Sequence, residues 1–400
     1  MGTRSQDDMP VAEMPRTLDE MADLRARGPV ARVRFAVGGE AWVVLSHQHA
    51  RELLADARLG RAPLVRQDVP HRAAFPKFLK NTLMFTDQPQ HARLRRLVAK
   101  WFTARRVESY RDRTTAVAHR LIDDLEGAGA PADLIAGFAA PLPLDVLTNL
   151  LGVPMEHKHR FEEWVRVLLS IDARTAQQAD AAMDEMAAYL TEAIGRKRAH
   201  PEEDLLSGLA SVRDKDDSLT GEEILWIAML VLTGGFDNTA NAIGTGVYAL
   251  LRHAEQRAVF QSDPDRFVTT LTEEVLRHGR QSVGEGHQVA GVPFLALEPI
   301  EFAGIRIEPG EFVVVHRTSA NHDETVFDEP GRFDVTRSPN PHLGFSHGAH
   351  HCLGAPLARM ELQVAFTTLF ARLPDLAPAG EPRFLREMLS APMAELPVRW

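Results

Sequence analysis

Cys352 is the only cysteine in this chain of 400 residues, and it lies in a loop rich in histidine and glycine. The loop, residues 344–354, reads GFSHGAHHCLG, with three histidines before the thiol. An isolated cysteine is most often a small buried hydrophobic residue. Where it does chemistry, it acts as a nucleophile, as one ligand of zinc, or as the thiolate ligand of haem iron.

Each of these roles of Cys352 requires different residues nearby. Zinc would be bound by Cys352 with His347, His350 and His351, but adjacent ligands on so short a loop rarely close a tetrahedron. No second pair of ligands follows elsewhere. A nucleophile would find a base among the histidines, yet nothing nearby resembles an oxyanion hole. A thiolate bound to haem iron suits the loop best, and zinc stays as the minor alternative.

The residues after Cys352 favour an ionised ligand. Residues 353–373, LGAPLARMELQVAFTTLFARL, predict a helix with Pro356 in its first turn, where proline is tolerated. Cys352 would then lie just before a helix N-terminus, whose dipole and free N–H groups stabilise an anion and lower a thiol pKa. Gly348 and Gly354 would let the backbone approach a flat macrocycle closely.

A second candidate for chemistry is a polar stretch inside a long apolar helix. Residues 218–252 begin with Thr220 and Glu223 at the capping-box spacing and are apolar on nearly all faces early on, which predicts a buried central helix. Two glycines then precede Asp237 and Asn238. This stretch is either a kink packed against a neighbouring helix or a bulge beside a ligand, with the carboxylate of Asp237 aimed into it.

The elements that position these residues are mostly helical. Helical patterns run from about Thr115 to Arg277, interrupted by prolines. Residues 30–45 predict a hairpin around a Gly-Gly pair, and a second extended zone runs from Phe294 to Val315. We therefore expect a mainly α fold with a minor β part (α+β), in which distant parts of the chain supply the strands.

Composition excludes several classes of protein. The net charge is −10, which argues against nucleic acid as the main partner. One cysteine cannot form an internal disulfide, which fits a reducing cytosol. The polar, acidic N-terminus has no apolar run of signal-peptide or anchor length, so we expect a cytoplasmic protein with no membrane attachment.

Taken together, these motifs resemble those of a bacterial cytochrome P-450, a haem-thiolate monooxygenase, over nearly the whole chain. The cysteine loop is similar to the family pattern Phe-Gly-x-Gly-x-His/Arg-x-Cys-x-Gly. Four other stretches resemble family motifs in the family order: DQPQHARLRRLVAKWF with His91 and Arg95, GGFDNT of the central helix, EEVLR with Glu274 and Arg277, and the meander ANHDETVFDEPGRFDVTR.

The resemblance implies a fold and a cofactor. It implies a single domain over residues 1–400, with a small β-rich lobe that includes about 28–46 and 294–316. The cofactor would be haem b, with Cys352 as the iron ligand. Residues implied in contact with the haem are His91, Arg95, Gly234, Phe345, His350 and Gly354. Haem carboxylates need cationic hydrogen-bond donors, which His91, Arg95 and His350 would supply, whereas Glu274 and Arg277 would form a structural ion pair.

The resemblance also implies a reaction and partners. The chain would activate O₂ to hydroxylate or otherwise oxidise a small, largely apolar organic molecule of secondary metabolism. Electrons would come from a ferredoxin and its NAD(P)H-dependent reductase. Arg93, Arg96 and Lys100 would face outward as a local basic patch for that acidic partner.

Three positions depart from the family pattern. The family relays protons with an acid followed by threonine, whereas here Asn238 follows Asp237 and Thr239 comes one residue later, about 100° further round the helix. Phe294 stands where most bacterial relatives carry arginine, so one haem carboxylate contact is missing or is supplied by a residue such as Arg280 or His287. Ser346 replaces a loop glycine, which is tolerable if its backbone avoids the left-handed region.

The substrate and the exact oxidation stay open. The apolar wall of a pocket would include Phe75, Phe78, Met84, Phe85, Met388 and Met393, although core packing explains such residues equally well. Oxidative coupling without oxygen insertion is an alternative that Asn238 favours. A haem-binding protein without catalysis is an alternative of a different class.

Overall fold

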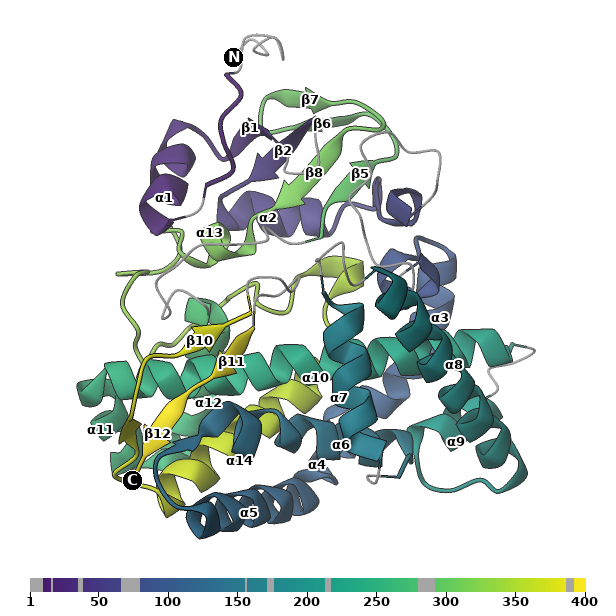
Figure 1. Cartoon of the computed structure of the whole chain (residues 1–400). Helices are drawn as coiled ribbons and strands as arrows, with labels where there is room; N and C mark the ends of the chain where they lie inside the picture. Colours follow the sequence, from purple (N-terminus) through teal and green to yellow (C-terminus); the bar gives the residue numbers. More distant parts are fainter. Residues whose placement is uncertain are drawn as a thin grey trace.

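The computed structural model describes residues 10–15, 17–34, 39–65, 80–154, 157–170, 176–212, 217–279, 292–385 and 392–400. Figure 1 shows a small sheet at one end of the molecule and a larger body of helices at the other. The α-helices are α1 (Leu18–Arg27), α2 (His47–Leu54), α3 (Gln90–Ala99), α4 (Ala104–Glu108), α5 (Arg111–Ala128), α6 (Pro141–Leu151), α7 (Lys158–Leu168), α8 (Ala176–Ala199), α9 (Leu205–Ser211), α10 (Gly221–Arg252), α11 (Ala254–Ser262), α12 (Pro264–His278), α13 (Arg317–Asn321) and α14 (Ala355–Arg372).

The strands are short. They are β1 (Val30–Arg34), β2 (Glu40–Val44), β3 (Leu59–Gly60), β4 (Ala132–Asp133), β5 (Phe294–Ala296), β6 (Ile300–Phe302), β7 (Ile305–Ile307), β8 (Phe312–Val315), β9 (Ala377–Pro378), β10 (Arg383–Phe384), β11 (Met393–Glu395) and β12 (Pro397–Arg399). Short helical turns complete the described chain: η2 (Ala62–Val65), η4 (Leu83–Phe85), η5 (Lys100–Phe102), η6 (Ile135–Ala139) and η10 (Gly348–His350).

The largest sheet joins parts of the chain that are far apart in sequence, in the order β1-β2-β8-β5-β3. The expected hairpin is present, with β1 and β2 antiparallel and Val30 opposite Val44. β8 pairs parallel with β2 and antiparallel with β5, which brings the two predicted extended zones together. Alternate residues of β2 enter different hydrophobic clusters, Val43 on the helical side and Trp42 on the other, so the strand is buried on both faces.

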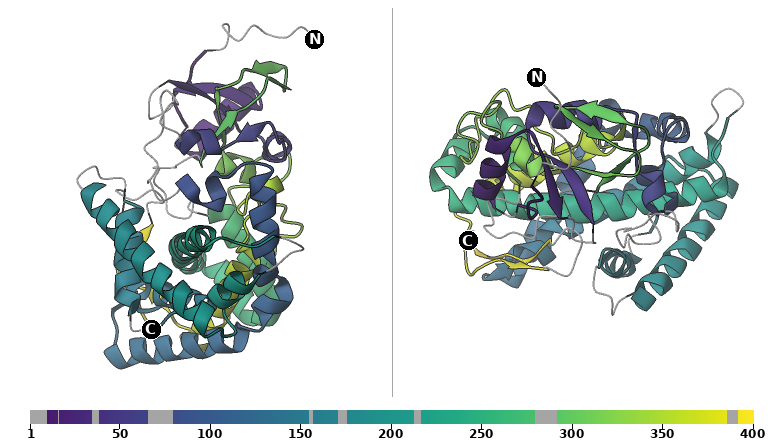
Figure 2. Two further views of the ribbon diagram at one scale, coloured as in Figure 1. Left: turned by 90° about the vertical axis from the view of Figure 1, so that its right-hand side faces the viewer. Right: turned by 90° about the horizontal axis from the view of Figure 1, so that it is seen from above.

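Helix α10 crosses the helical body beneath the sheet (Figures 1 and 2). Its N-terminus has the expected capping box, because the Glu223 amide donates to Thr220 Oγ1 at 3.1 Å and the Thr220 amide donates to Glu223 Oε2 at 2.8 Å. The helix packs against α6, α8, α12 and α14. Contacts on so many sides account for its nearly uniform apolar character.

The glycine pair of α10 produces neither a break nor a bulge, because the helix is continuous from Gly221 to Arg252. A Cβ on Gly235 would lie 2.9 Å from Leu147 Cδ2 of α6, so this glycine permits close helix packing. A Cβ on Gly234 would meet nothing nearer than Leu230 Cδ1, at 4.0 Å. The two glycines therefore have different roles: one faces a neighbouring helix and the other faces open space.

Candidate active site

The cysteine loop is held by its own backbone and by α2. The Cys352 amide donates to the Phe345 carbonyl at 2.9 Å, which closes the loop around η10. Gly348 has a positive φ of 69°, and a Cβ there would lie 2.2 Å from the Leu54 carbonyl oxygen. The structure thus corrects the expected role of Gly348: this glycine permits a left-handed turn against α2, and it is Gly354 that has no atom within 4 Å of an added Cβ.

Ser346 lies in the left-handed region, so the condition under which serine readily replaces glycine is not met. Its φ is 64°, and its amide donates to the Leu343 carbonyl at 2.9 Å. Residues with a Cβ adopt this conformation at a cost of roughly 1–2 kcal/mol, since the Cβ approaches the following carbonyl. The turn that brings the chain to Cys352 therefore stores strain at Ser346 that a glycine would not.

Cys352 is exposed to solvent, but the protein around its thiol desolvates that group and so changes its pKa. Burial raises its pKa, and this effect outweighs the stabilisation of a thiolate by the Gly354 N–H and by Arg317, Arg95 and Arg359. The Gly354 N–H at the helix N-terminus does lower the thiol pKa as expected, but desolvation outweighs it and the net shift is upward. An iron ion bound by Cys352 would favour the thiolate, because a coordinating thiol is deprotonated.

Five basic side chains from distant parts of the chain gather near this loop, and we call them the basic cluster: Arg61, His91, Arg95, Arg317 and His350. The rings of His91 and His350 have centroids 4.2 Å apart. Burial lowers the pKa of His350 to about 3, and the charges of Arg61, His91 and Arg95 add to this effect. Burial likewise lowers the pKa of His91, with Arg95 and Arg61 adding to it. Both imidazoles are therefore neutral at pH 7 and can donate one hydrogen bond each.

Helix α3 presents its basic residues in two directions. His91 is buried and Arg95 is half-buried, so both turn inward as the i, i+4 spacing predicts. Arg93 is expected to face outward with Arg96 and Lys100 as part of a basic patch, but it is bound by two carboxylates. Its guanidinium donates to Asp217 Oδ1 at 2.8 Å and to Glu223 Oε1 at 2.6 Å, which ties α3 to the start of α10 and offsets its charge. Arg96 and, directly after the helix, Lys100 are exposed.

Phe294 occupies the sheet beside the basic cluster, and Arg61 lies over its ring. The Arg61 Cζ is 4.1 Å from the ring centroid. The sequence indicated Arg280 and His287 as substitutes for an arginine at position 294, but both lie outside the described residues. Sequence reasoning missed Arg61, Arg317 and Arg359. The available signal for Arg61 was its place directly after a strand in a Gly-Arg-Ala-Pro turn.

Phe345 is fixed by the residues around it. The Arg359 guanidinium lies over its ring, with Cζ 4.7 Å from the centroid. Arg359 also binds Glu273 with two hydrogen bonds, of 2.7 and 2.8 Å, and His342 Nε2 lies 2.9 Å from the same carboxylate. Burial would raise the pKa of Glu273, but the hydrogen bonds from Arg359 and His342 outweigh it and lower that pKa to about 2. The cysteine loop is thereby anchored to α12 and α14.

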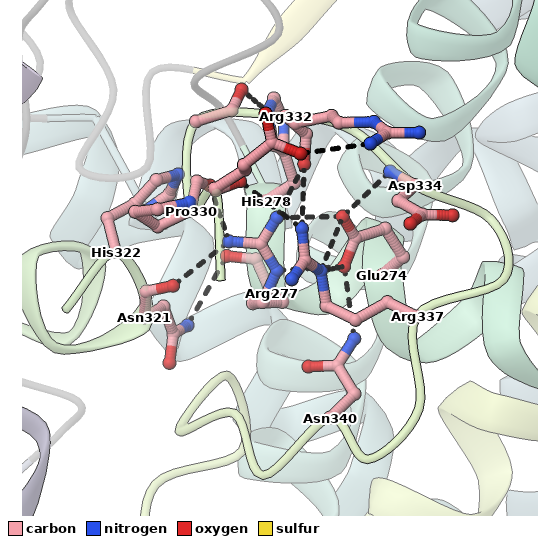
Figure 3. A network of polar contacts seen from close by, with 12 residues as sticks. Glu274, Arg277, His278, Asn321, His322, Pro330, Arg332, Asp334, Arg337 and Asn340 are labelled. Atoms are coloured by element: carbon pink, nitrogen blue, oxygen red, sulfur yellow. Dashed lines mark hydrogen bonds and ion pairs between the residues drawn. The ribbon is translucent and has the colours of Figure 1, made fainter. Parts of the chain in front are cut away.

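The expected ion pair between Glu274 and Arg277 is present and fully buried (Figure 3). Arg277 donates to both carboxylate oxygens of Glu274, at 2.7 and 2.8 Å. Its remaining N–H groups donate to the carbonyls of Asn321, Pro330 and Arg332, at 2.7–3.0 Å. Because these acceptors belong to the meander before the cysteine loop, the pair fixes the path of the chain into the site.

On α10, Asn238 is exposed between two buried neighbours, Asp237 and Thr239. Asn238 Nδ2 donates to the Gly234 carbonyl at 2.8 Å, one turn earlier. This bond fixes the amide and leaves its second N–H and its carbonyl oxygen available. The chain near the C-terminus lies against the same helix, since the Met393 amide donates to Asn241 Oδ1 at 3.1 Å.

The expected apolar wall is tested only in part. Phe85 and Met393 are buried in the main hydrophobic core, and Met84 packs against it. These contacts favour core packing for the three residues. Phe75, Phe78 and Met388 lie outside the described residues.

The described residues fit a haem. Cys352 is exposed for ligation, and at Gly354 and Gly234 an added Cβ would meet no atom nearer than 4.0 Å. The basic cluster suits the two carboxylates of such a cofactor, because an anion stabilises neighbouring guanidinium charges and the two neutral imidazoles of the cluster can each donate a hydrogen bond. Zinc is not supported: within the described ranges no group of three or more His, Cys, Asp or Glu side chains could hold a metal ion.

Comparison with known proteins decides the family. Residues 287–384 match the family model described as Cytochrome P-450. The chain is 40% identical to the mycinamicin IV hydroxylase/epoxidase of Micromonospora griseorubida, over 94% of this chain and 94% of that protein. The chain belongs to the cytochrome P-450 family.

Solved cytochrome P-450 structures have the same fold. A mutant of the mixed-function P-450 MycG in complex with mycinamicin V superposes with a TM-score of 0.89 and 39% identity, covering 98% of this chain and all of that one. A cytochrome P-450 with biaryl coupling reactivity superposes with a TM-score of 0.87 and 36% identity, covering 97% of this chain and 98% of that one. The expected α+β fold is confirmed.

Membership in the cytochrome P-450 family establishes the class of chemistry. The chain is a haem-thiolate monooxygenase that oxidises a small organic molecule with O₂ and electrons from a redox partner. Within the described residues, no helix is long and apolar enough to cross a membrane.

Proposed function

We propose that this chain binds haem b through Cys352 and inserts one oxygen atom of O₂ into a small, largely apolar molecule of secondary metabolism. The observation that carries the proposal is the exposed thiol of Cys352 beside Arg95, Arg317 and Arg359, at the start of α14. The hydroxylase/epoxidase activity of the similar mycinamicin enzyme supports oxygen insertion. The same proposal takes residues 1–400 as one domain and the cytoplasm as its location.

The haem supplies the activation of O₂, which its thiolate ligand assists. The residues of the chain bind and orient it. Cys352 is the sulfur ligand, and Phe345 and Gly354 shape the loop around it. His91, Arg95 and His350 donate hydrogen bonds to the carboxylates of the cofactor, and Gly234 leaves room on the opposite side.

Proton delivery is assigned to Asp237 and Asn238. Asp237 is the carboxyl group that can exchange a proton. Asn238 is held by its bond to the Gly234 carbonyl, so its free amide groups can orient a water or a substrate hydroxyl. Thr239 belongs to the same stretch, but its side chain projects about 100° further round the helix than that of Asn238, and it is left out of the relay.

The electron donor in this proposal is a ferredoxin with its NAD(P)H-dependent reductase. Arg96 of α3 and Lys100 at the start of η5 are exposed, which supports the docking of an acidic protein. Oxidative coupling is the second candidate reaction. It is favoured by Asn238 in place of the family threonine and by the fold shared with a P-450 that has biaryl coupling reactivity.

The first test is the absorption spectrum of the reduced, CO-bound protein. We expect the strongly red-displaced Soret band of a thiolate ligand, and we expect Cys352→Ser to lose it while still folding. A haem-loaded native protein without that band would overturn the proposed function.

The relay is tested by Asp237→Asn. We expect the rate of product formation to fall about 100-fold, because general acid–base groups contribute on this scale. Haem content and the CO-bound spectrum should stay unchanged. The substrate for this assay is first found by spin-state shifts across a compound library. Asp180→Asn, a change on α8, is the control, and equal effects of the two changes would contradict the relay.

A further inference from the structure

Arg61 is a member of the basic cluster whose guanidinium lies over an aromatic ring and whose backbone is fixed by a carboxylate. Its guanidinium stacks on Phe294 at 4.1 Å, an arrangement that fixes the plane of the group. Its backbone is fixed as well, because the amides of Arg61 and Ala62 donate to the two oxygens of Asp87 at 2.7 and 3.0 Å. A Cβ on Gly60 would lie 2.5 Å from Asp87 Oδ2, so Gly60 makes this clamp possible.

The guanidinium itself has unused donors. Arg61 Nε is buried and has no hydrogen-bond partner, and Nη2 makes one long contact of 3.5 Å with the Val292 carbonyl. The nearby carboxylate of Asp87 already accepts two backbone N–H groups. A buried arginine left in this state is unfavourable, since an unsatisfied charged donor bears its full desolvation cost.

The surroundings of Arg61 point to an anion that approaches from the side of the cluster. The charge of Arg61 acts on His91 and His350, and that of Arg317 acts on Arg61. These side chains come from the residue before η2, from α3, from α13 and from the cysteine loop, so segments distant in sequence bring basic groups close together. A planar guanidinium matches a carboxylate with two parallel hydrogen bonds.

We propose that Arg61 binds a carboxylate of the haem, with Phe294 as the platform that holds its guanidinium. The arginine expected at position 294 is thus replaced by a pair of residues, a stacking ring on β5 and a cation delivered from the turn after β3. This inference rests on the proposed function, since it takes haem b with its two carboxylates as the cofactor.

The test compares Arg61→Gln with native protein loaded with either haem or haem dimethyl ester, in which both carboxylates are methylated. Haem loss is measured as the rate of transfer to an excess of an apo-protein acceptor. With natural haem, we expect Arg61→Gln to lose the cofactor about tenfold faster, which is the scale of one charge-assisted hydrogen bond. With the dimethyl ester, native protein and Arg61→Gln should lose it at the same rate.

Arg58→Gln is the matched control. Arg58 lies three residues earlier and is exposed, and its guanidinium pairs with Asp56 at 2.6 Å. It should retain haem as native protein does. Arg61→Lys keeps the charge but not the planar fork, and we expect an intermediate rate; this variant serves if Arg61→Gln does not fold. The midpoint potential of the iron should fall in Arg61→Gln, because a cation near the haem has been removed.

Two results would overturn the inference. One is an unchanged rate of haem loss in Arg61→Gln, and the other is an equal acceleration with haem and its dimethyl ester, which would show a structural role. The reduced CO spectrum separates these failures from a failure of the proposed function. A red-displaced band in all variants leaves haem-thiolate ligation intact, whatever the rates show.

Discussion

Ser346 shows how one residue can strain the loop that carries the iron ligand. Its φ of 64° places a residue with a Cβ in a conformation that suits glycine. The loop keeps this conformation because it is fixed on both sides, by the bond between the Cys352 amide and the Phe345 carbonyl and by the packing of Gly348 against Leu54. The strain is therefore held by the surrounding structure and can be removed without changing the path of the chain.

Ser346→Gly should stabilise the folded protein by about 1 kcal/mol, because glycine adopts a positive φ without a steric cost. The measurement is the free energy of unfolding in urea for the haem-loaded protein. Ser346→Ala is the control and should give no gain, since it keeps the Cβ. A gain of the same size in both variants would show that the hydroxyl, and not the backbone, is responsible.

For single residues, the predictions that agree with the structure are those that depend on spacing within one helix. The Thr220–Glu223 capping box and the inward turn of His91 and Arg95 depend on spacing within one helix, so sequence is sufficient for them. The stacking of Arg61 on Phe294 joins residues more than two hundred positions apart, and no local pattern encodes it. The net rise in the pKa of Cys352 is likewise not encoded locally, because desolvation depends on the folded surroundings.

At the scale of elements, α10 and α14 approach so closely that their contact needs a glycine. A Cβ on Gly246 of α10 would lie 2.5 Å from Phe366 Cζ of α14 and 3.0 Å from Val275 Cγ2 of α12. Three helices therefore meet at one position without a side chain. Since α14 begins three residues after Cys352 and α10 carries Asp237, this contact sets the separation between the two sides of the site.

Gly246→Ala should destabilise the protein by about 1–2 kcal/mol, because the strain of overpacking exceeds the gain in helix propensity. Gly127→Ala on α5 is the matched control: an added Cβ there has no atom within 4 Å, so that change should stabilise by up to about 1 kcal/mol. Thermal unfolding of both variants checks the prediction. A stabilised Gly246→Ala would mean that the helices move apart freely.

Sequence was less informative about how the elements meet. The existence of a long central helix and of a sheet built from distant strands followed from apolar periodicity. The sequence predicts for the glycine pair of α10 either a kink packed against a neighbouring helix or a bulge; the packing is confirmed at Gly235, but the helix is continuous, with neither kink nor bulge. Periodicity gives the buried face of a helix but not the distance to its neighbour, which depends on the particular side chains that meet.

For the whole molecule, buried histidines make stability depend on pH. Burial lowers the pKa of His278 and His316 to about 4 and that of His322 to about 3. Their ordinary value is near 6.5, so the unfolded chain binds protons that the folded chain excludes. Stability is fully present above about pH 6.5 and is lost as the pH falls towards the folded values.

His322→Gln should reduce this loss of stability between pH 6.5 and 4 by roughly 1–3 kcal/mol, since it removes one of the titrating groups. The readout is the thermal midpoint across this pH range, compared with native protein. His159→Gln, at a side chain that is 81% exposed, is the control and should leave the pH dependence as it is. Identical pH profiles for native protein and His322→Gln would refute the assignment.

The basic cluster would also make the stability of the folded chain depend on its cofactor. The guanidinium groups of Arg61, Arg95 and Arg317 lie with His91 and His350 where burial and neighbouring positive charges both disfavour charge. A ligand that binds only the folded chain and relieves this repulsion adds its binding free energy to folding. The folded chain without haem would therefore be less stable than the same chain with haem bound, and the difference would grow with the concentration of free haem.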